Sequence, residues 1–120
     1  MKFSKAQKRY QEKLNEKILA EWEDALSYYN EYDRLYYPKW ERLNHCNAYI
    51  CYLDHYVFLK SYNTIVAFFD YYNYILYDVL RYEYGYTSTS AQHISKFRNE
   101  MRYAYHLSPN EIEECRYYPI

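Results

Sequence analysis

Two histidines and two cysteines fall within eleven residues, as His45, Cys46, Cys51 and His55. Thiolate and imidazole groups are the ligands that zinc prefers in proteins. Structural zinc sites usually take cysteines in pairs two to four residues apart, whereas the spacing here is irregular and crosses an expected boundary between a helix and a strand. We therefore expect two small buried thiols, two partly exposed histidines, and no metal or other cofactor.

His93 follows a run of four hydroxyl residues, numbered 87–90, where a helix is expected to begin. A serine and a histidine can form a nucleophilic pair, but no acid is placed to orient His93 and no glycine-rich turn offers an oxyanion hole. We expect the hydroxyls to cap the helix and His93 to lie at the surface or pack. An alternative that stays open is phosphate binding by the free N–H groups of this helix start.

The acidic residues do not predict a catalytic pair. Three of them fall in the first turn of the expected last helix, where they offset its dipole: Glu111, Glu113 and Glu114. Three others are too scattered over the expected strands for general acid–base chemistry: Asp70, Asp78 and Glu83. A single glycine in 120 residues also excludes the phosphate loop and the dinucleotide fingerprint. We expect no enzyme.

Tyrosine dominates the composition, with 21 residues among 120. This is more than a core of this size can bury, and both members of an adjacent pair on a helix or strand cannot face inward. Tyrosine is also favoured at interfaces, because its large ring is ordered at low entropy cost. The predicted partner-binding tyrosines are two adjacent pairs: Tyr28, Tyr29, Tyr36 and Tyr37. Codon bias in an AT-rich genome is an alternative and compatible source of the tyrosines.

Charge is divided along the first 37 residues. Residues 1–17 contain six Lys or Arg and two Glu, whereas residues 18–37 contain five acids and Arg34. Lys5, Lys8 and Arg9 could neutralise phosphates while tyrosines stack on bases, so nucleic-acid binding is the alternative function. The pI near 6.4 and the acidic second block favour a protein partner instead.

The segment from Ser4 to Tyr37 predicts one long helix. Ser4 is a plausible N-cap, Pro38 ends the segment, and apolar residues recur every three or four positions: Tyr10, Leu14, Ile18, Trp22, Ala25, Tyr29, Tyr32 and Tyr36. Such a helix is about 50 Å long at about 1.5 Å per residue, so it overhangs a small domain. We therefore expect part of this apolar stripe to contact a partner or a second copy, unless the helix bends or breaks near Tyr28–Tyr29 and folds onto its own core.

Together with the rest of the chain, this helix predicts an α+β fold in one domain, residues 1–120. The domain is divided into residues 1–37, 38–86 and 87–120. Pro38 begins a short helix over Lys39–Asn47, and three aromatic and β-branched runs form an antiparallel meander: His55–Lys60, Thr64–Asp70 and Tyr74–Tyr82. Gly85 follows, where the backbone needs a positive φ. Two helices complete the chain. One begins with a capping box of Thr89 and Gln92, and a short one begins at Ser108 and ends by Pro119.

Overall composition predicts a location. The net charge is -1, and no apolar run is long enough for a membrane span or a signal peptide. Three cysteines, an odd number, fit a reducing compartment. We therefore expect a cytoplasmic protein.

Two stretches resemble known families. Leu59–Asp70 together with Tyr84–Phe97 contains the pattern SYxTxVA, then a tyrosine-rich strand, then a TTSxHxxKF-like helix start. This pattern resembles a small domain of Firmicutes phage and mobile-element proteins that carries no assigned chemistry. The resemblance implies a phage source and a fold rather than an activity.

The second resemblance lies in Phe3–Tyr10, which is similar to the opening of an anti-CRISPR family from Firmicutes prophages that inhibits the type II RNA-guided nuclease. The acidic, DNA-mimicking strands of that family are absent from this chain. The resemblance implies a phage-encoded, non-enzymatic inhibitor. Its expected partner is a host protein or ribonucleoprotein such as a CRISPR effector nuclease, and a homodimer is possible.

Overall fold

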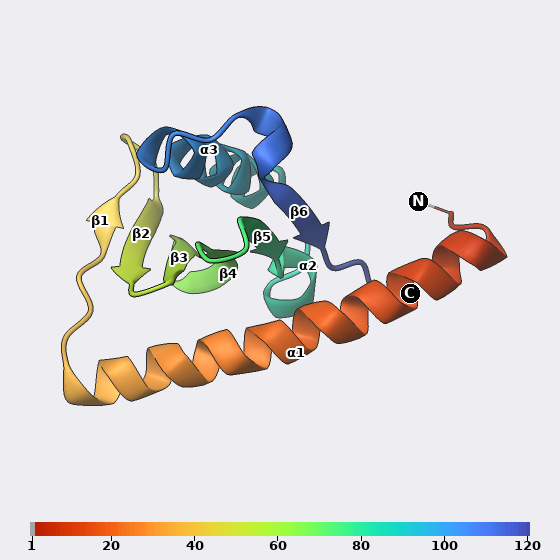
Figure 1. The fold of residues 1–120 in the computed structure, drawn as a ribbon, viewed down its shortest axis with the longest axis horizontal. Coiled ribbons are helices and arrows are strands. Elements are labelled where there is room, and N and C mark those ends of the chain that lie inside the picture. The colour runs from red at the N-terminus through yellow and green to blue at the C-terminus, as the bar shows by residue number, and fades with distance from the viewer. Residues whose placement is uncertain (1) are drawn as a thin grey trace.

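A computed structural model describes residues 2–120. The chain forms one long helix, a six-stranded sheet and a second helix on the opposite side of that sheet (Figure 1). The sequence-based assignment to the α+β class is confirmed. None of the helices in residues 2–120 combines the length and apolar character needed to cross a membrane.

Helix α1 runs without interruption from Lys5 to Leu35. Ser4 caps its start through a capping box, in which the Ser4 hydroxyl accepts from the Gln7 N–H and the Gln7 side chain accepts from the Ser4 N–H. The helix does not break near Tyr28–Tyr29. Its stripe is buried only in the middle, at Ile18, Trp22 and Ala25, so both ends extend past the sheet.

The sheet has the order β1-β2-β3-β4-β5-β6. Each of the first five strands pairs antiparallel with the next, and β6 pairs parallel with β5. The strand bounds are Glu41–Arg42 for β1, Ala48–Leu53 for β2, Tyr56–Ser61 for β3, Thr64–Asp70 for β4, Ile75–Asp78 for β5 and Glu113–Arg116 for β6.

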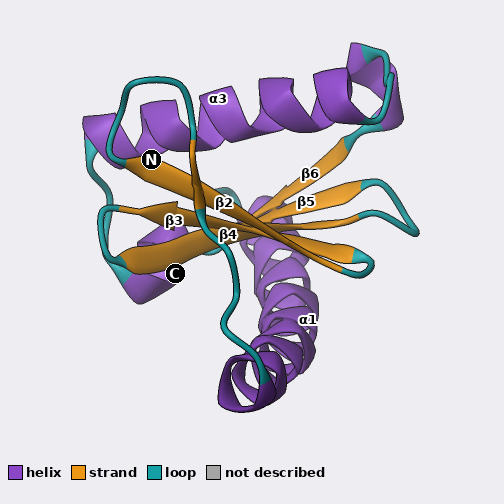
Figure 2. Ribbon diagram, turned by 90° about the vertical axis from the view of Figure 1, so that its left-hand side faces the viewer, coloured by secondary structure: helices purple, strands orange, loops and turns teal. Residues whose placement is uncertain are grey.

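The sheet separates two apolar cores. Residues such as Phe58, Phe68 and Tyr77 pack on the α1 side, whereas Val57, Leu59 and Phe69 pack on the other side. That second side is covered by α3, Ser88–Ala104, through Ile94, Phe97 and Met101 (Figure 2). The central strands are buried on both faces, which explains their almost unbroken apolar sequence.

Three short-range predictions are wrong. Residues 39–47 form β1 and a turn rather than a helix, and the strand predicted over Tyr74–Tyr82 ends at Asp78 and gives way to the short helix α2, Leu80–Glu83. The Thr89–Gln92 capping box is replaced by Thr87, whose hydroxyl accepts from the Ser90 N–H.

The last predicted helix is also wrong. Its capping box forms between Ser108 and Glu111, but it closes only the 3₁₀ turn η1, Pro109–Glu111. The chain then enters β6, because Cys115 is buried against the sheet and the backbone pairs with β5. Gly85 does adopt a positive φ, +81°, as predicted.

Candidate functional site

The seven predicted binding residues do not form one surface, because α1 separates them. Lys5, Lys8 and Arg9 lie in its first turns and are exposed. Tyr36 lies at its opposite end, about 46 Å from Lys5 at about 1.5 Å per residue. The basic group and the tyrosines are therefore two separate candidate surfaces.

Tyr28 and Tyr29 are half-buried and pack against the sheet. The Tyr29 ring lies 5.4 Å from that of Phe58 and 5.9 Å from that of Trp40, between centroids. The Tyr28 ring lies 5.6 Å from that of Tyr56, and its hydroxyl donates to the Asp54 carboxylate at 3.4 Å. Burial raises the pKa of both phenols, with Asp54 adding to the effect on Tyr28. Tyr29 contributes mainly to packing.

Tyr36 and Tyr37 project from the protein where α1 ends. The residue before a proline is driven out of the helical region, and Tyr37 precedes Pro38. The helix has already ended one residue earlier, because Tyr36 is the C-cap and has an extended backbone, with φ -138° and ψ 161°. The relative exposures are 60% for Tyr36 and 97% for Tyr37, and Leu35 beside them is 55% exposed.

These residues border two adjoining hollows. One, of about 200 Å³, is lined by Tyr28, Glu31, Tyr32, Leu35 and Tyr36. The other, of about 330 Å³, is lined by Tyr32, Tyr37, Lys39, Glu41, Tyr52 and Leu53. Tyr32 lines both, so the two hollows are neighbours on the surface. We define the aromatic surface by its rings and one aliphatic side chain: Tyr28, Tyr32, Leu35, Tyr36 and Tyr37.

The aromatic surface has an apolar centre and a charged edge. Tyr32 and Tyr36 contact each other one helical turn apart, with ring centroids 5.1 Å apart. Glu31 and Arg34 form an exposed ion pair at 2.6 Å beside them. Tyr52 pairs with Val57 across β2 and β3 and so faces α3 rather than α1, and its pKa is raised to about 12, mainly by burial and also by Glu100 of α3. An apolar centre with a polar rim is the usual organisation of a protein–protein interface.

Sequence reasoning missed Tyr32 and Leu35 as members of this surface. Tyr32 and Leu35 were detectable, because they follow Tyr28 by four and seven residues and so share its helix face.

The histidines and cysteines considered for zinc lie apart. The Cys46 thiol donates to the Leu43 carbonyl at 2.9 Å, and Cys51 is buried in the core on the α1 side. His45 is exposed, and the His55 ring stacks on Tyr72 at 4.7 Å. Within residues 2–120, no three His, Cys, Asp or Glu side chains are grouped to hold a metal ion.

His93 belongs to a buried polar cluster. Its Nδ1 is hydrogen-bonded to the Ser61 hydroxyl at 2.7 Å, and Ser61 is hydrogen-bonded to the Ser90 hydroxyl at 2.9 Å. All three side chains are buried, and they connect β3 to the first two turns of α3. Burial, with a smaller contribution from Lys96, lowers the pKa of His93. The arrangement secures the helix start rather than exposing a nucleophile.

The acidic candidates have separate partners. Asp70 accepts from the Tyr72 N–H at 2.9 Å, and Glu83 accepts from the Trp22 indole at 2.7 Å. Asp78 pairs with Arg116 at 3.1 Å. Glu113 and Glu114 lie on β6 rather than in a first helical turn, which corrects their predicted placement, whereas Glu111 caps η1.

Comparison with known proteins gave no relatives: no family model, no curated protein and no solved structure matches this chain.

Proposed function

We propose that this chain is a non-enzymatic binding protein that contacts a protein partner through the aromatic surface. The observation that carries the proposal is the exposure of three consecutive residues, Leu35, Tyr36 and Tyr37, beside hollows lined by Tyr32. Tyrosine rings inserted into a partner gain large contact area for few ordered torsions. A surface that exposes such rings together is typical of an interaction site.

The specific form of this proposal is a phage-encoded inhibitor that acts in the cytosol of a host cell on a type II RNA-guided nuclease. The opening segment Phe3–Tyr10 supports this form through its resemblance to an anti-CRISPR family. Inhibition requires no chemistry from such a protein, because occupying the nuclease or its guide-RNA complex is sufficient.

The experiment compares three tagged proteins in pull-downs from a Firmicutes lysate: the native chain, the double variant Tyr36→Ser/Tyr37→Ser, and the control Tyr103→Ser. Tyr103 is 80% exposed on α3 and so matches the exposed tyrosines without belonging to the aromatic surface. We expect one partner to be retained by the native chain and the control and lost with the double variant. Retention by all three proteins would refute the role of the aromatic surface.

A cleavage assay tests the specific form. The nuclease, loaded with guide RNA, is given target DNA with each of the three proteins. We expect the native chain and Tyr103→Ser to block cleavage and the double variant to be at least 10-fold weaker. Full cleavage at saturating native protein would exclude this nuclease as the partner.

Nucleic-acid binding by the basic end of α1 is the second candidate. Lys5, Lys8 and Arg9 are exposed, and no ion pair among residues 2–120 engages them. Binding of this kind weakens steeply with salt, because neutralised phosphates release counterions. Reversal of all three residues to Glu would then abolish binding to free DNA or RNA.

A further inference from the structure

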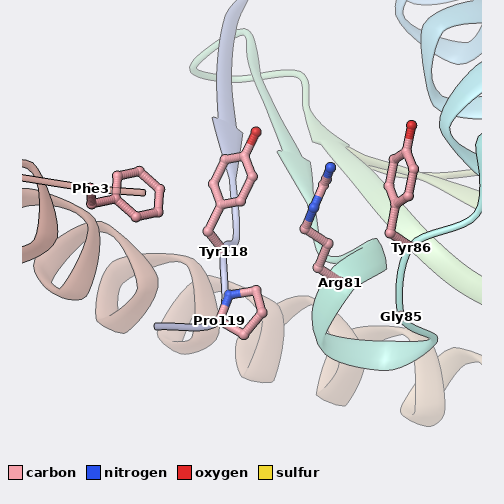
Figure 3. Close-up of a pocket in the computed structure, with 6 residues that line it drawn as sticks. All are labelled: Phe3, Arg81, Gly85, Tyr86, Tyr118 and Pro119. Carbon is pink, nitrogen blue, oxygen red and sulfur yellow. The ribbon is translucent and has the colours of Figure 1, made fainter. Parts of the chain in front are cut away.

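A pocket lies where three distant segments of the chain meet (Figure 3). Its volume is about 460 Å³, within the range of small-molecule sites. The segment before α1 contributes Phe3, α2 contributes Arg81, and the loop after α2 contributes Gly85 and Tyr86. Tyr118 and Pro119 of the C-terminal tail complete the lining.

Arg81 is held between two aromatic rings. Its guanidinium carbon lies 4.5 Å from the centroid of Tyr86 and 4.7 Å from that of Tyr118. Figure 3 shows the side chain between the two rings, with its nitrogens on the same side as both hydroxyls. Stacking of this kind orients the planar group and leaves its N–H edge available.

The Arg81 guanidinium has no acceptor among residues 2–120: no hydrogen bond or ion pair of the described chain involves it. The nearby carboxylate of Asp78 is already occupied, because it accepts from Arg116 Nε at 3.1 Å and from the Leu80 N–H at 3.0 Å. Arg116 is further paired with Glu114 at 2.9 Å. Arg81 therefore supplies the unbalanced positive charge of this pocket.

Two rings of the pocket, those of Tyr118 and Phe3, are held in place by contacts. The backbone of Tyr118 makes two hydrogen bonds with the Asn15 side chain, and its hydroxyl accepts from Arg116 Nη1 at 3.4 Å. Phe3 packs edge-on against the Tyr118 ring with centroids 5.7 Å apart. A site that is organised before binding loses less entropy when a ligand enters.

We propose that this pocket binds a nucleoside 5′-phosphate, either as a free nucleotide or as one unit of a single strand. The guanidinium edge of Arg81 matches the geometry of a phosphate and can donate two parallel hydrogen bonds to it. Phe3 and the face of the exposed Tyr86 ring that is turned away from Arg81 offer surfaces on which a base can stack. Lys2 and Lys5 flank Phe3 in the sequence, with Cα atoms no more than about 7 Å from its own, and add positive charge.

This site is independent of the aromatic surface. It lies at the N-terminal end of α1, whereas the aromatic surface lies at the C-terminal end of the same helix (Figure 1). Loss of one function through mutation at its site therefore leaves the other testable.

Calorimetric titration of the full chain with AMP, adenosine and inorganic phosphate tests the proposal. We expect AMP to bind and each fragment to bind at least 10-fold more weakly, because the ring and the phosphate are recognised together. Arg81→Gln and Arg81→Lys should each weaken AMP binding at least 10-fold, since lysine cannot stack as a plane. The matched control is Arg34→Gln, an exposed arginine at the far end of α1, which should leave AMP binding unchanged.

Circular dichroism shows whether each variant folds. Tyr86→Leu, at a ring that is 57% exposed, serves as a second variant if those at Arg81 do not fold, and it should also weaken AMP binding. A six-nucleotide oligoadenylate distinguishes the two sources: tighter, salt-sensitive binding indicates a strand, and binding equal to AMP indicates a free nucleotide. Absence of AMP and oligoadenylate binding at millimolar concentration would overturn the proposal. So would equal affinity for AMP in the native chain and in folded variants at Arg81 and Tyr86.

Discussion

The Asn15 side chain pairs with the backbone of Tyr118 on both of its polar edges. Its Nδ2 donates to the Tyr118 carbonyl at 2.6 Å, and its Oδ1 accepts from the Tyr118 N–H at 3.2 Å. Gln11, one turn earlier, donates to the Arg116 carbonyl at 2.9 Å. Side-chain amides of α1 thus take the place of a neighbouring strand and hold the C-terminal tail against the helix.

Replacement of Asn15 by Asp should release this tail. The variant keeps the acceptor for the Tyr118 N–H but sets a carboxylate against the Tyr118 carbonyl, so one hydrogen bond becomes a repulsion. We expect a loss of about 1–3 kcal/mol in the free energy of unfolding. Urea denaturation measures this loss, and carboxypeptidase digestion should become faster. Digestion at the native rate would show that the tail is held by other contacts.

The middle of α1 should not tolerate a charge. Ile18 is fully buried against the sheet, so Ile18→Asp places an unpaired carboxylate in the core and should cost about 4 kcal/mol or more. Tyr10→Asp is the control, because Tyr10 is 70% exposed on the same helix and should change stability by less than about 0.5 kcal/mol. Thermal unfolding followed by circular dichroism compares the two. Equal melting temperatures for the two variants would contradict the packing described for α1.

The elements that could be predicted are those with a local cause. The period of α1 and the Ser4 cap identified one long helix, although its buried stripe is restricted to the residues that face the sheet. The β-branched and aromatic run Thr64–Asp70 gave β4 with the observed bounds. The strand predicted over His55–Lys60 is displaced by one residue from β3.

The elements that were missed depend on distant contacts. Ser108 and Glu111 do form a capping box, but the chain after it extends because β5 offers a parallel edge. Pro38 indicated a helix start, yet residues 41–42 pair with β2. Neither of these pairing strands can be recognised from the residues next to the segment that pairs with it. The Arg81 pocket could not be predicted for the same reason, since it combines Phe3, Tyr86 and Tyr118 from three segments.

Stability should fall in mild acid because of His93. Its pKa in the folded protein is lowered, so the folded state resists protonation while the unfolded chain takes up a proton near pH 6.5. The stability that comes from keeping His93 neutral is fully present above about pH 6.5 and is lost as the pH falls from there to the pKa of the folded state. It amounts to about 1.4 kcal/mol for each unit by which the folded pKa lies below the unfolded pKa.

The variant His93→Gln isolates this effect, since glutamine can hydrogen-bond Ser61 without titrating. Urea unfolding at pH 7.5 and pH 5 should show a larger loss for the native chain than for the variant. An equal loss for both proteins would indicate that His93 is protonated as easily when folded as when unfolded.

Thiol reactivity should differ among the three cysteines. Burial raises the pKa of the Cys51 thiol to about 11 and raises the pKa of the Cys115 thiol as well, so burial disfavours the reactive thiolate at both. Cys46 is partly exposed in the turn before β2. We expect one rapid reaction per native chain with a disulfide reagent at Cys46 and two more after unfolding, located by mass spectrometry. Rapid modification of Cys51 in the native protein would contradict its burial.

The most direct test of the aromatic surface is the Kd of the purified partner for the native chain, for Tyr36→Ser/Tyr37→Ser and for Tyr103→Ser. Truncating an anchor residue typically costs about 2 kcal/mol or more, so the double variant should raise Kd by about 30-fold or more. The Tyr103→Ser control should match the native chain. Equal Kd values for all three proteins would contradict the proposal, as would binding that vanishes with rising salt and with the reversal of Lys5, Lys8 and Arg9.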